Sequence, residues 1–515
     1  MPFDRYPRIF GAVFAGVVTL GTTLPGQAQT RPVVKTLSGP VRGVSSNGVE
    51  SFKGIPFAAP PVGPLRWRAP QPVKPWAAVR DASAFGAPCM QVISAPQATF
   101  LPRGTPSEDC LTIDVYRPAN VSPKVRLPVL YWIYGGAFAR GATSVPAYDG
   151  TAFAKKGVVL VAVNYRVGRF GFFAHPALTR ENADGALANY GLMDQIAGLK
   201  WVRGNIAKFG GDPRRVTIFG ESAGGISVNL LMTSPTARGL FQAAIAQSSF
   251  GREQQETLPE AERTGAEDAE RWGVSPNASA AELRAAPADK VVVTNPGLYA
   301  NGQAPIIDGK IVPRHVIDTF AQGLEARVPF IIGTTVSEFP VLGGPVAERV
   351  PAFATLPDSV KSAYGSEAEY KKTFISDALL VEPASTIAMF HSRYAPTWLY
   401  LFGTISDELK KRVSDAPHGS ELPYLFQTFD APGITMTQRD RLRGGEMASY
   451  WASFATRYDP STSSLPAWPI AGKGSILYFS NDAPIAQTNP NAAKIKAIRD
   501  ESGKSIRPLV RPAGS

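Results

Sequence analysis

Along the first half of the chain, apolar residues occur either in short continuous runs or at three- and four-residue steps. Val129 to Ile133 and Val158 to Val163 are short, continuous apolar runs, which are typical of strands covered on both faces of a sheet. From Ile196 to Phe209, apolar side chains recur at three- and four-residue steps, which predicts a helix that ends at the next Gly–Gly pair. Buried strands that alternate with helices indicate a mainly parallel α/β sheet.

The same patterns predict the remaining strands and set several segments apart. Further strands are expected at Val41–Val44, Glu50–Phe52, Leu111–Tyr116, Val216–Phe219, Ala243–Ala246, Val328–Ile332 and Trp398–Phe402. The Gly- and Pro-rich segment 54–63 is expected to follow the surface without regular structure. Residues 251–322 and 343–395 are predicted to be helical insertions beside the sheet, where they would form a lid or a pocket wall.

The N-terminus has the pattern of an export signal. Two arginines precede an apolar stretch from Ile9 to Leu24, and Gly26-Gln27-Ala28 is a small-x-small cleavage site. A membrane anchor is the alternative, but the stretch is short for a bilayer span and is interrupted by Gly and Thr. We therefore predict a signal peptide at 1–28, a single exported domain at 29–515 that is periplasmic or secreted, and no later membrane span.

Charge adds one hypothesis about ligands. The chain has 53 Lys and Arg against 42 Asp and Glu, a formal net charge of +11. Excess positive charge favours solubility, and near a cleft it also attracts anions. Arg140 and Arg252 are the candidates for such attraction, with structural ion pairing as the alternative. The sequence shows neither the basic run nor the aromatic platform typical of nucleic-acid binding.

The strongest chemical signal lies in the stretch from Phe219 to Gly225. It follows an apolar strand pattern and precedes Ile226 to Met232, which can be helical, so it predicts a sharp turn between strand and helix. A serine at such a turn has its hydroxyl exposed above the sheet, and the helix N-terminus behind it favours negative charge. Ser222 is therefore predicted to be a nucleophile.

A serine hydroxyl needs a base, which is most often histidine. The chain has four histidines, His175, His315, His391 and His418. Catalytic groups in open α/β sheets collect at the C-terminal ends of strands. His418 alone lies in a loop after the last predicted strand, so it is the predicted base, with a surface or packing role as the alternative.

The imidazole in turn needs a carboxylate to hold its tautomer. In this arrangement the acid lies between the nucleophile and the histidine along the chain. Glu338 lies in the loop that leaves the predicted strand Val328–Ile332, and it is the predicted acid. Asp308 is the alternative, but its Asp–Gly sequence is typical of an ordinary turn.

Two further features complete the predicted site. Gly135 and Gly136 follow a buried strand and, with Ala223, are the expected N–H donors to the oxyanion, a flexible glycine turn being the alternative. Cys89 and Cys110 are expected to pair in an exported protein and to close a loop of about 20 residues. Two free buried thiols are the alternative.

Several blocks of the chain together resemble the type-B carboxylesterases, the family of the cholinesterases and the bacterial para-nitrobenzyl esterases. The similarity covers nearly the whole mature chain. The blocks are Phe52–Ala58 with Pro60–Gly63, Ser107–Leu111, Asn164–Arg166, Asn189–Gln195, Phe209–Pro213, Phe219–Gly225 and His418–Tyr424.

This resemblance implies an α/β-hydrolase fold with a mostly parallel central sheet, flanking helices and a bridge between the two cysteines. It implies a triad of Ser222, Glu338 and His418 together with the oxyanion hole described above. It also implies supporting residues, which are Glu221, Ser248 and Glu421, with the last two steadying His418.

The chain departs from the family pattern at two places. Many members have His at the position of Tyr134, although Tyr also occurs there. The residues after Ser248 are Ser249 and Phe250, where Gly is frequent, and their side chains are expected to narrow the pocket.

The function implied is that of an exported serine hydrolase of carboxylic esters that needs no metal and no cofactor. Acylation of Ser222 would release the alcohol, and water activated by His418 would release the acid. The expected partner is a small-molecule ester, including one that carries a carboxylate. Two alternatives are a non-catalytic binding relative, which would typically lack triad residues, and an amidase or peptidase, which would usually carry an additional domain.

Overall fold

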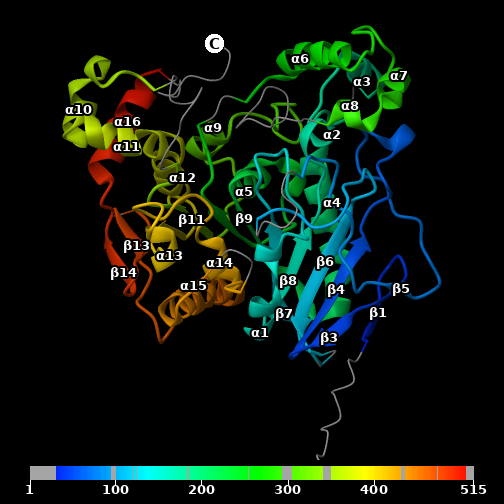
Figure 1. Cartoon of the computed structure of the whole chain (residues 1–515), viewed down its shortest axis with the longest axis horizontal. Coiled ribbons are helices and arrows are strands. Elements are labelled where there is room, and N and C mark those ends of the chain that lie inside the picture. The colour runs from blue at the N-terminus through cyan, green and yellow to red at the C-terminus, as the bar shows by residue number, and fades with distance from the viewer. Residues whose placement is uncertain are drawn as a thin grey trace, which may run out of the picture.

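An eleven-stranded sheet runs through the molecule, with a small three-stranded sheet beside one edge (Figure 1). The computed structural model describes residues 31–93, 100–119, 121–122, 124–182, 185–252, 255–292, 304–339, 350–430, 435–472 and 474–505. The predicted signal peptide at 1–28 therefore lies outside the described residues.

The order of strands in the large sheet is β14-β13-β12-β11-β10-β9-β7-β8-β6-β4-β3. Every neighbouring pair from β8 to β13 is parallel. The pairs toward the two edges are antiparallel. The mainly parallel α/β sheet predicted from the apolar runs is confirmed.

The bounds of the strands agree closely with the apolar patterns in the centre of the sheet. The large sheet comprises β3 Val44–Ser46, β4 Val49–Pro56, β6 Thr112–Pro118, β7 Leu127–Ile133, β8 Val159–Val163, β9 Gly211–Glu221, β10 Ala243–Gln247, β11 Phe330–Thr335, β12 Thr397–Phe402, β13 Ser475–Phe479 and β14 Pro484–Thr488. The small sheet comprises β1 Val33–Lys35, β2 Pro40–Arg42 and β5 Arg80–Asp81. All residues of β8, β10 and β11 are buried, which explains their continuous apolar sequences.

Two groups of helices flank the sheet. Helices α4 and α5 pack on each other and on β9, and α1, α14 and α15 form a second packed group against β6, β7 and β9. Their bounds are α1 Thr151–Lys155, α4 Tyr190–Asn205, α5 Ala223–Thr233, α14 Leu422–Phe426 and α15 Gln438–Arg457. The short helices α2 Gly168–Gly171, α3 Pro176–Glu181 and α13 Asp407–Lys410 lie in connections. The periodic segment 196–209 is therefore helical as predicted, ending in a 3₁₀ turn before Gly210.

The described parts of the two predicted insertions are largely helical. Between β10 and β11 lie α6 Leu258–Arg271, α7 Ala280–Ala285, α8 Ala288–Val291 and α9 Val316–Ala321. Between β11 and β12 lie α10 Asp358–Tyr364, α11 Glu367–Ser376, the π-helix η7 Asp377–Val381 and α12 Glu382–His391. The last helix, α16 Ala492–Ser505, packs on α10 and α12. Figure 1 shows both groups at the same end of the sheet, at the top of the view.

The expectation for segment 54–63 is wrong at its start. Strand β4 continues to Pro56 past a bulge between Phe52 and Ile55, and Ile55 pairs with Ile113 of β6. At the bulge, Gly54 has a φ of 66° and its N–H donates to Oδ1 of Asp114 at 2.7 Å. A bulge breaks the two-residue alternation, so the sequence pattern hides a strand that the glycine permits.

Strands β13 and β14 were not predicted, and they change the position of His418 relative to the last strand of the sheet. His418 follows β12 as predicted, but β12 is not the last strand, because β13 pairs with it in parallel. Strand β14 is an edge strand with three exposed residues out of five, so it lacks the apolar run of a buried strand.

One helical stretch, Glu367–His391, is long and apolar enough to be a candidate membrane span by length and composition. This finding corrects the expectation that no stretch after the signal peptide is long and apolar enough to span a membrane. Within the molecule, 67% of its apolar window is buried. It also carries Asp377 and Glu382, which are buried and paired with Lys494 and Arg252. Packing as a core helix therefore accounts for its apolar character.

Candidate active site

Ser222 lies at the turn between β9 and α5, as its sequence context predicts. Its φ is 58°, a conformation that residues with a side chain rarely adopt. Its backbone N–H donates to the carbonyl of Gln247 at 3.0 Å. A Cβ at Gly220 would lie 2.5 Å from the backbone of Gly224, and one at Gly224 would lie 2.0 Å from the carbonyl of Ile133. The two glycines are therefore required by the tightness of the turn that exposes Ser222.

Glu338 and His418 lie side by side on two loops that follow adjacent strands. Nδ1 of His418 lies 2.5 Å from Oε2 of Glu338, which is 1% exposed. The other carboxylate oxygen, Oε1, accepts hydrogen bonds from the hydroxyl of Ser248 at 2.7 Å and from the N–H of Thr335 at 2.8 Å. Ser248 thus supports the carboxylate directly, and the histidine only through it. A fixed carboxylate at Nδ1 favours the tautomer that leaves Nε2 free to accept a proton.

Two more buried carboxyl groups lie near the imidazole. Oε1 of Glu221 lies 3.1 Å from Nε2 of His418. Glu421 accepts a hydrogen bond from the side chain of Gln247 at 3.3 Å. Its influence on His418 is electrostatic. Sequence reasoning named both glutamates as supporting residues, and the structure brings both to the site.

Burial and mutual repulsion shape the charges of this cluster. Burial raises the pKa of Glu221 and of Glu421, and the charge of Glu338 raises both further. Burial works to lower the pKa of His418, but the negative charges of Glu221 and Glu338 outweigh it and raise that pKa to about 10. The imidazole and these carboxyl groups therefore titrate as one coupled group, in which an ionised Glu221 favours the protonated form of His418.

The glycine pair after β7 lies directly against the serine turn. A Cβ at Gly135 would lie 2.9 Å from Cβ of Ser222 and 2.6 Å from the carbonyl oxygen of Glu221. Gly136 has a φ of 119°, and its carbonyl accepts hydrogen bonds from the N–H groups of Ala139 and Arg140 at 3.1 Å each. Ala223, the third predicted donor, begins helix α5 next to Ser222. The structure thus brings all three predicted donors to the serine turn.

The two cysteines form a disulfide, as predicted, and the loop that they close is fastened beside this glycine pair. The side-chain amide of Gln91 donates to the carbonyl of Gly141 and accepts from its N–H, both at 2.8 Å. The hydroxyl of Ser144 accepts from the N–H of Arg103 at 3.1 Å and donates to its carbonyl at 2.8 Å. The disulfide loop therefore braces the chain that follows Gly135 and Gly136.

An aromatic side chain that sequence reasoning missed covers the histidine. The ring of Phe339 stacks on the imidazole of His418 with 5.3 Å between centroids, and the ring of Phe250 lies 6.5 Å from Phe339. The only sequence signal for Phe339 was its place directly after Glu338. Ser249 is buried and its hydroxyl accepts a hydrogen bond from Asn229 at 3.0 Å. The narrowing of the pocket expected at Ser249 and Phe250 stays a prediction.

The alternative residues have structural partners elsewhere. Nδ1 of His175 accepts from the N–H of Ala177 at the start of α3, and His391 lies between the carboxylate of Glu325 and the carbonyl of Val328. His315 precedes α9. Oδ1 of Asp308 accepts from the N–H groups of residues 310–312, which is the turn that its sequence indicated. Across the described ranges, no group of three or more His, Cys, Asp or Glu is arranged to hold a metal ion.

The two candidate arginines differ in their partners. Arg252 forms a two-pronged ion pair with Glu382, which is fully buried, at 2.5 and 2.8 Å. Arg140 is exposed, and its guanidinium makes no ion pair within the part of the chain that the structure describes. For Arg252 the structural alternative therefore applies, whereas Arg140 remains a free charge on the loop that follows Gly136.

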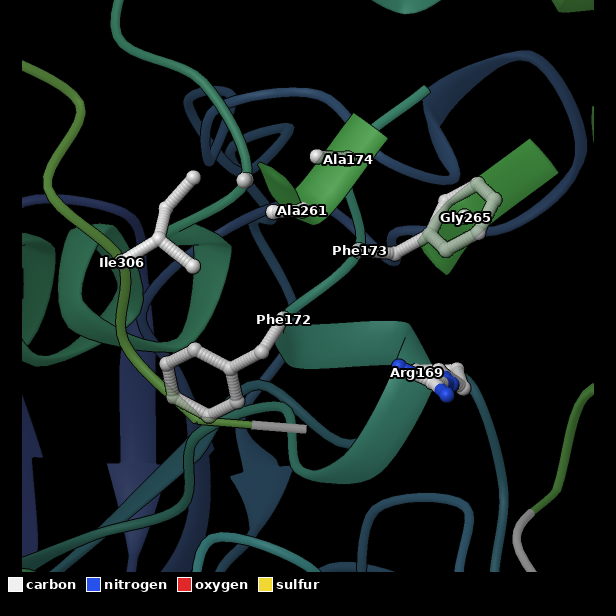
Figure 2. A pocket seen from close by; sticks show the side chains of 8 residues that line it. Arg169, Phe172, Phe173, Ala174, Ala261, Gly265 and Ile306 are labelled. Atoms are coloured by element: carbon white, nitrogen blue, oxygen red, sulfur yellow. The ribbon is translucent and has the colours of Figure 1, made fainter. Parts of the chain in front are cut away.

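A small pocket lies between α2, the residues 172–174 that follow it, and α6 (Figure 2). The side chains around it, which include Phe172, Ala261 and Ile306, leave essentially no room for a water molecule. Beside it, Arg169 forms an ion pair with Asp268 at 2.5 Å. None of the predicted site residues lines this pocket, so it is separate from the serine turn.

In comparisons with known proteins, the sequence and the fold of this chain match those of esterases. The family model described as "Carboxylesterase family" matches residues 30–343 and 358–498. The chain is 36% identical over 493 residues to fumonisin B1 esterase of Sphingopyxis macrogoltabida, covering 89% of each chain. It is 35% identical over 509 residues to para-nitrobenzyl esterase of Bacillus subtilis, covering 92% of this chain and 100% of the relative. A solved structure titled as a thermophilic PNB esterase superimposes with a TM-score of 0.78 at 32% identity, covering 91% of this chain and 100% of the other.

Proposed function

The chain belongs to the carboxylesterase family and is a carboxylic ester hydrolase, and from that premise we propose that it works through an acyl-enzyme on Ser222. The observation that carries the proposal is the 2.5 Å contact between His418 and Glu338 beside the strained turn that exposes Ser222. A nucleophile, a base and a group that orients the base are the three parts that acyl transfer from an ester requires.

In the first half of the reaction, Oγ of Ser222 attacks the ester carbonyl carbon and its proton passes to Nε2 of His418. The carbonyl oxygen becomes an oxyanion, which the N–H groups of Gly135, Gly136 and Ala223 stabilise. When this intermediate collapses, the bond to the alcohol oxygen breaks and that oxygen takes the proton from His418. The alcohol leaves, and the acyl group remains on Ser222.

In the second half, a water molecule attacks the acyl carbon and gives its proton to His418. The second tetrahedral intermediate uses the same N–H donors. Its collapse breaks the bond to Oγ of Ser222, which takes back the proton, and the carboxylic acid leaves. Through both halves Glu338 holds the imidazole, with support from Ser248.

The charges of the buried residues Glu221 and Glu421 affect how readily His418 accepts a proton. If Glu221 and Glu421 were both ionised together with Glu338, three negative charges would hold the imidazole in its protonated form. Burial raises the pKa of Glu221 to about 7 and that of Glu421 to about 8, so at neutral pH Glu221 is ionised in part of the enzyme. In the enzyme molecules in which both glutamates are neutral, Glu338 alone stabilises the imidazolium that appears during proton transfer, which is the charge balance a general base needs.

The proposed substrate is a small-molecule ester, and esters that carry a free carboxylate are included because Arg140, on the loop after Gly136, has no ion-pair partner among the residues that the structure describes. The relatives are named as para-nitrobenzyl, fumonisin B1 and cocaine esterases, so their names refer to esters of different structure. We further propose export to the periplasm or the medium. The N-terminal pattern at 1–28 and the Cys89–Cys110 disulfide both support it, since disulfides persist in oxidising compartments.

A panel of 4-nitrophenyl esters of increasing acyl length, run beside matching 4-nitroanilides, tests this function. We expect ester turnover to exceed anilide turnover, and Ser222→Ala to lower kcat by about 10⁴-fold or more. Ser234→Ala is the matched control, since Ser234 is a buried serine at the C-terminal end of α5 with no proposed role in the reaction. A fluorophosphonate probe should label Ser222 in the wild type.

Each alternative has its own signature in the same panel. Equal or faster anilide cleavage would indicate an amidase or peptidase. No turnover of any ester, with no labelling of Ser222, would indicate a non-catalytic binding protein. Labelling at another serine would overturn the choice of nucleophile.

A further inference from the structure

A groove lies at the end of the large sheet opposite to Ser222. It has a volume of about 510 Å³ and lies between β1, the loop from β6 to β7 and the 3₁₀ turn η3 Ile206–Phe209. Strand β9 begins at Gly211, directly after a residue of the groove wall, and ends at Glu221, next to Ser222. The groove and the serine turn therefore lie at opposite ends of one strand. Figure 1 shows β1 at the lower end of the sheet, away from the helical insertions.

Two lysines give the groove a positive charge. Lys35 of β1 and Lys208 of η3 both line it and are exposed. Among the residues that the structure describes, neither lysine has an ion-pair partner. Arg117 lines the groove too, but a carboxylate oxygen of Glu50 lies 2.6 Å from its guanidinium and offsets its charge. An anion in the groove would therefore meet two uncompensated ammonium groups.

The loop from β6 to β7 extends the positive charge beyond the groove. Lys124 is exposed on this loop. The guanidinium of Arg215 donates to the carbonyl of Arg126 on the same loop at 3.2 Å, and the side chain of Arg214 beside it is 89% exposed. Arg214 and Arg215 share one carboxylate, that of Asp212, at 3.6 and 3.8 Å. Together, these residues carry a net positive charge.

Large apolar side chains are exposed on the same surface. Val33 lines the groove and is 51% exposed, and Leu37, in the turn after β1, is 68% exposed. The N–H of Leu37 donates to Oδ1 of Asn205 at 2.8 Å, so this turn lies next to η3 and Lys208. Val125 is exposed on the loop from β6 to β7. Exposed apolar side chains that gather in one place mark contact sites.

We propose that the groove and the side chains around it, together the basic face, dock the enzyme on an anionic phospholipid bilayer. Negative headgroups attract lysine and arginine, and apolar side chains enter the boundary between headgroups and acyl chains. A soluble polyanion would use the cations but would gain nothing from the exposed Val33 and Leu37. The two kinds of side chain together therefore favour a lipid surface. Docking through this face leaves the serine turn, at the other end of β9, open to esters in solution.

The chain that precedes β1 is joined to the protein at the basic face. Arg31 is the first residue that the structure describes, and Val33 follows two positions later. The apolar stretch Ile9–Leu24 lies before Arg31 in the sequence. If that stretch directs export as proposed, it enters a membrane while it is joined to this face. The basic face is then the part of the folded domain nearest to the lipid.

Cosedimentation with lipid vesicles tests the docking. Enzyme recovered after export, with its N-terminus determined by mass spectrometry, is mixed with vesicles of pure phosphatidylcholine or of phosphatidylcholine and phosphatidylglycerol in equal parts. We expect binding to the mixed vesicles alone. This binding should weaken as salt rises from about 0.01 M to about 1 M, since the Debye length falls from about 30 Å to about 3 Å.

Two variants separate the ionic and the apolar contributions. Lys35→Gln/Lys208→Gln should weaken binding to the mixed vesicles about 25-fold, because each lysine near an anionic surface contributes about fivefold. Leu37→Ser should weaken vesicle binding about fivefold but leave binding to heparin, a soluble polyanion, unchanged.

Lys290→Gln/Lys371→Gln is the matched control. These lysines are exposed on α8 and α11, in the two insertions, and their loss changes the net charge by the same amount. The control should bind vesicles like the wild type. All variants carry the same N-terminus, and unchanged hydrolysis of a nitrophenyl ester shows that each is folded.

Several results would overturn the proposal. One is the absence of binding to the mixed vesicles, and another is equal binding by the Lys35/Lys208 variant and the control. Equal binding to both kinds of vesicle would show that anionic headgroups are not recognised. Full vesicle binding by Leu37→Ser would remove the apolar contact on which the choice of lipid rests. Heparin binding that needs both lysines, without vesicle binding, would indicate an acidic polysaccharide instead.

Discussion

Oε1 of Glu221 lies 3.1 Å from Nε2 of His418, so the residue directly before the proposed nucleophile contacts the nitrogen that we propose accepts its proton. The opposite nitrogen, Nδ1, faces Glu338. The imidazole therefore lies between two carboxyl groups, and the protonation state of one of them decides how easily His418 can act as a base.

Glu221→Gln should shift the acid limb of the pH profile. The charge of Glu221 raises the pKa of His418, so a neutral amide should lower that pKa, and the histidine should lose its proton at lower pH. We expect the acid limb of kcat/KM to move down by about 1 pH unit or more. Steady-state kinetics on one nitrophenyl ester across the pH range measure this, with Glu267→Gln, an exposed glutamate on α6, as the control. An unmoved limb would mean that Glu221 is already neutral in the free enzyme.

Asp114→Asn should stabilise the protein at neutral pH. Asp114 is fully buried in β6, and burial raises its pKa from 3.8 to about 6. The folded state therefore holds this proton more tightly than the unfolded state, so the wild type loses stability as pH rises from about 4 to about 6, by about 3 kcal/mol. The variant escapes that loss.

Thermal melts at several pH values measure this effect. The melting temperature of Asp114→Asn relative to wild type should rise as pH increases from 4 to 7. A difference that stays constant with pH would show that the aspartate does not titrate in this range. Glu50→Gln, at another buried carboxylate on the neighbouring strand β4, is the control.

Loss of the disulfide should lower the stability of the fold and leave the reactivity of Ser222 largely unchanged. Cys89 and Cys110 are 21 residues apart, and opening such a loop costs about 3 kcal/mol on the chain-entropy model. The double variant Cys89→Ser/Cys110→Ser should therefore melt at a lower temperature while the fluorophosphonate probe still labels Ser222. Mass spectrometry of non-reduced wild type should find no free thiol. Two free thiols in protein recovered from the periplasm would contradict the bridge.

The charge preference of the substrate pocket should depend on Arg140. Arg140→Gln should lower kcat/KM for an ester that carries a carboxylate relative to its neutral analogue. In the wild type, any advantage of the charged ester should shrink with salt, since the Debye length falls from about 30 Å at 0.01 M to about 3 Å at 1 M.

Arg252→Gln is the contrasting variant. Because Arg252 pairs with the buried Glu382, its loss leaves a carboxylate unpaired and should lower the melting temperature without changing the ratio of the two esters. If Arg140→Gln also leaves that ratio unchanged and the salt response of both esters is flat, positive charge has no part in the choice of substrate.

The sequence was most informative where function depends on local backbone geometry. A strand, a tight glycine-flanked turn and a helix are contiguous in the chain, so Ser222 and its turn could be predicted from the residues between 216 and 232. The central strands were equally accessible, because burial on both faces demands continuous apolar runs. Strand β14 could not be predicted in this way because it is largely exposed. The end of β4 could not be predicted because the bulge at Gly54 breaks the two-residue alternation.

Contacts between distant residues were decided only by the tertiary structure. The sequence determined that Glu338, His418 and the Gly135–Gly136 pair follow strands that end near the nucleophile. It named Ser248 as a supporting residue and allowed an ion pair for Arg252, but it did not identify Glu338 and Glu382 as their partners, and it carried no signal that Phe339 covers His418. The hydroxyl groups of Tyr134 and Tyr165, which are 31 positions apart, each donate to the backbone carbonyl of the other residue. Local patterns record which face of an element is buried, whereas the partner of each buried polar group depends on how elements far apart in the chain pack together.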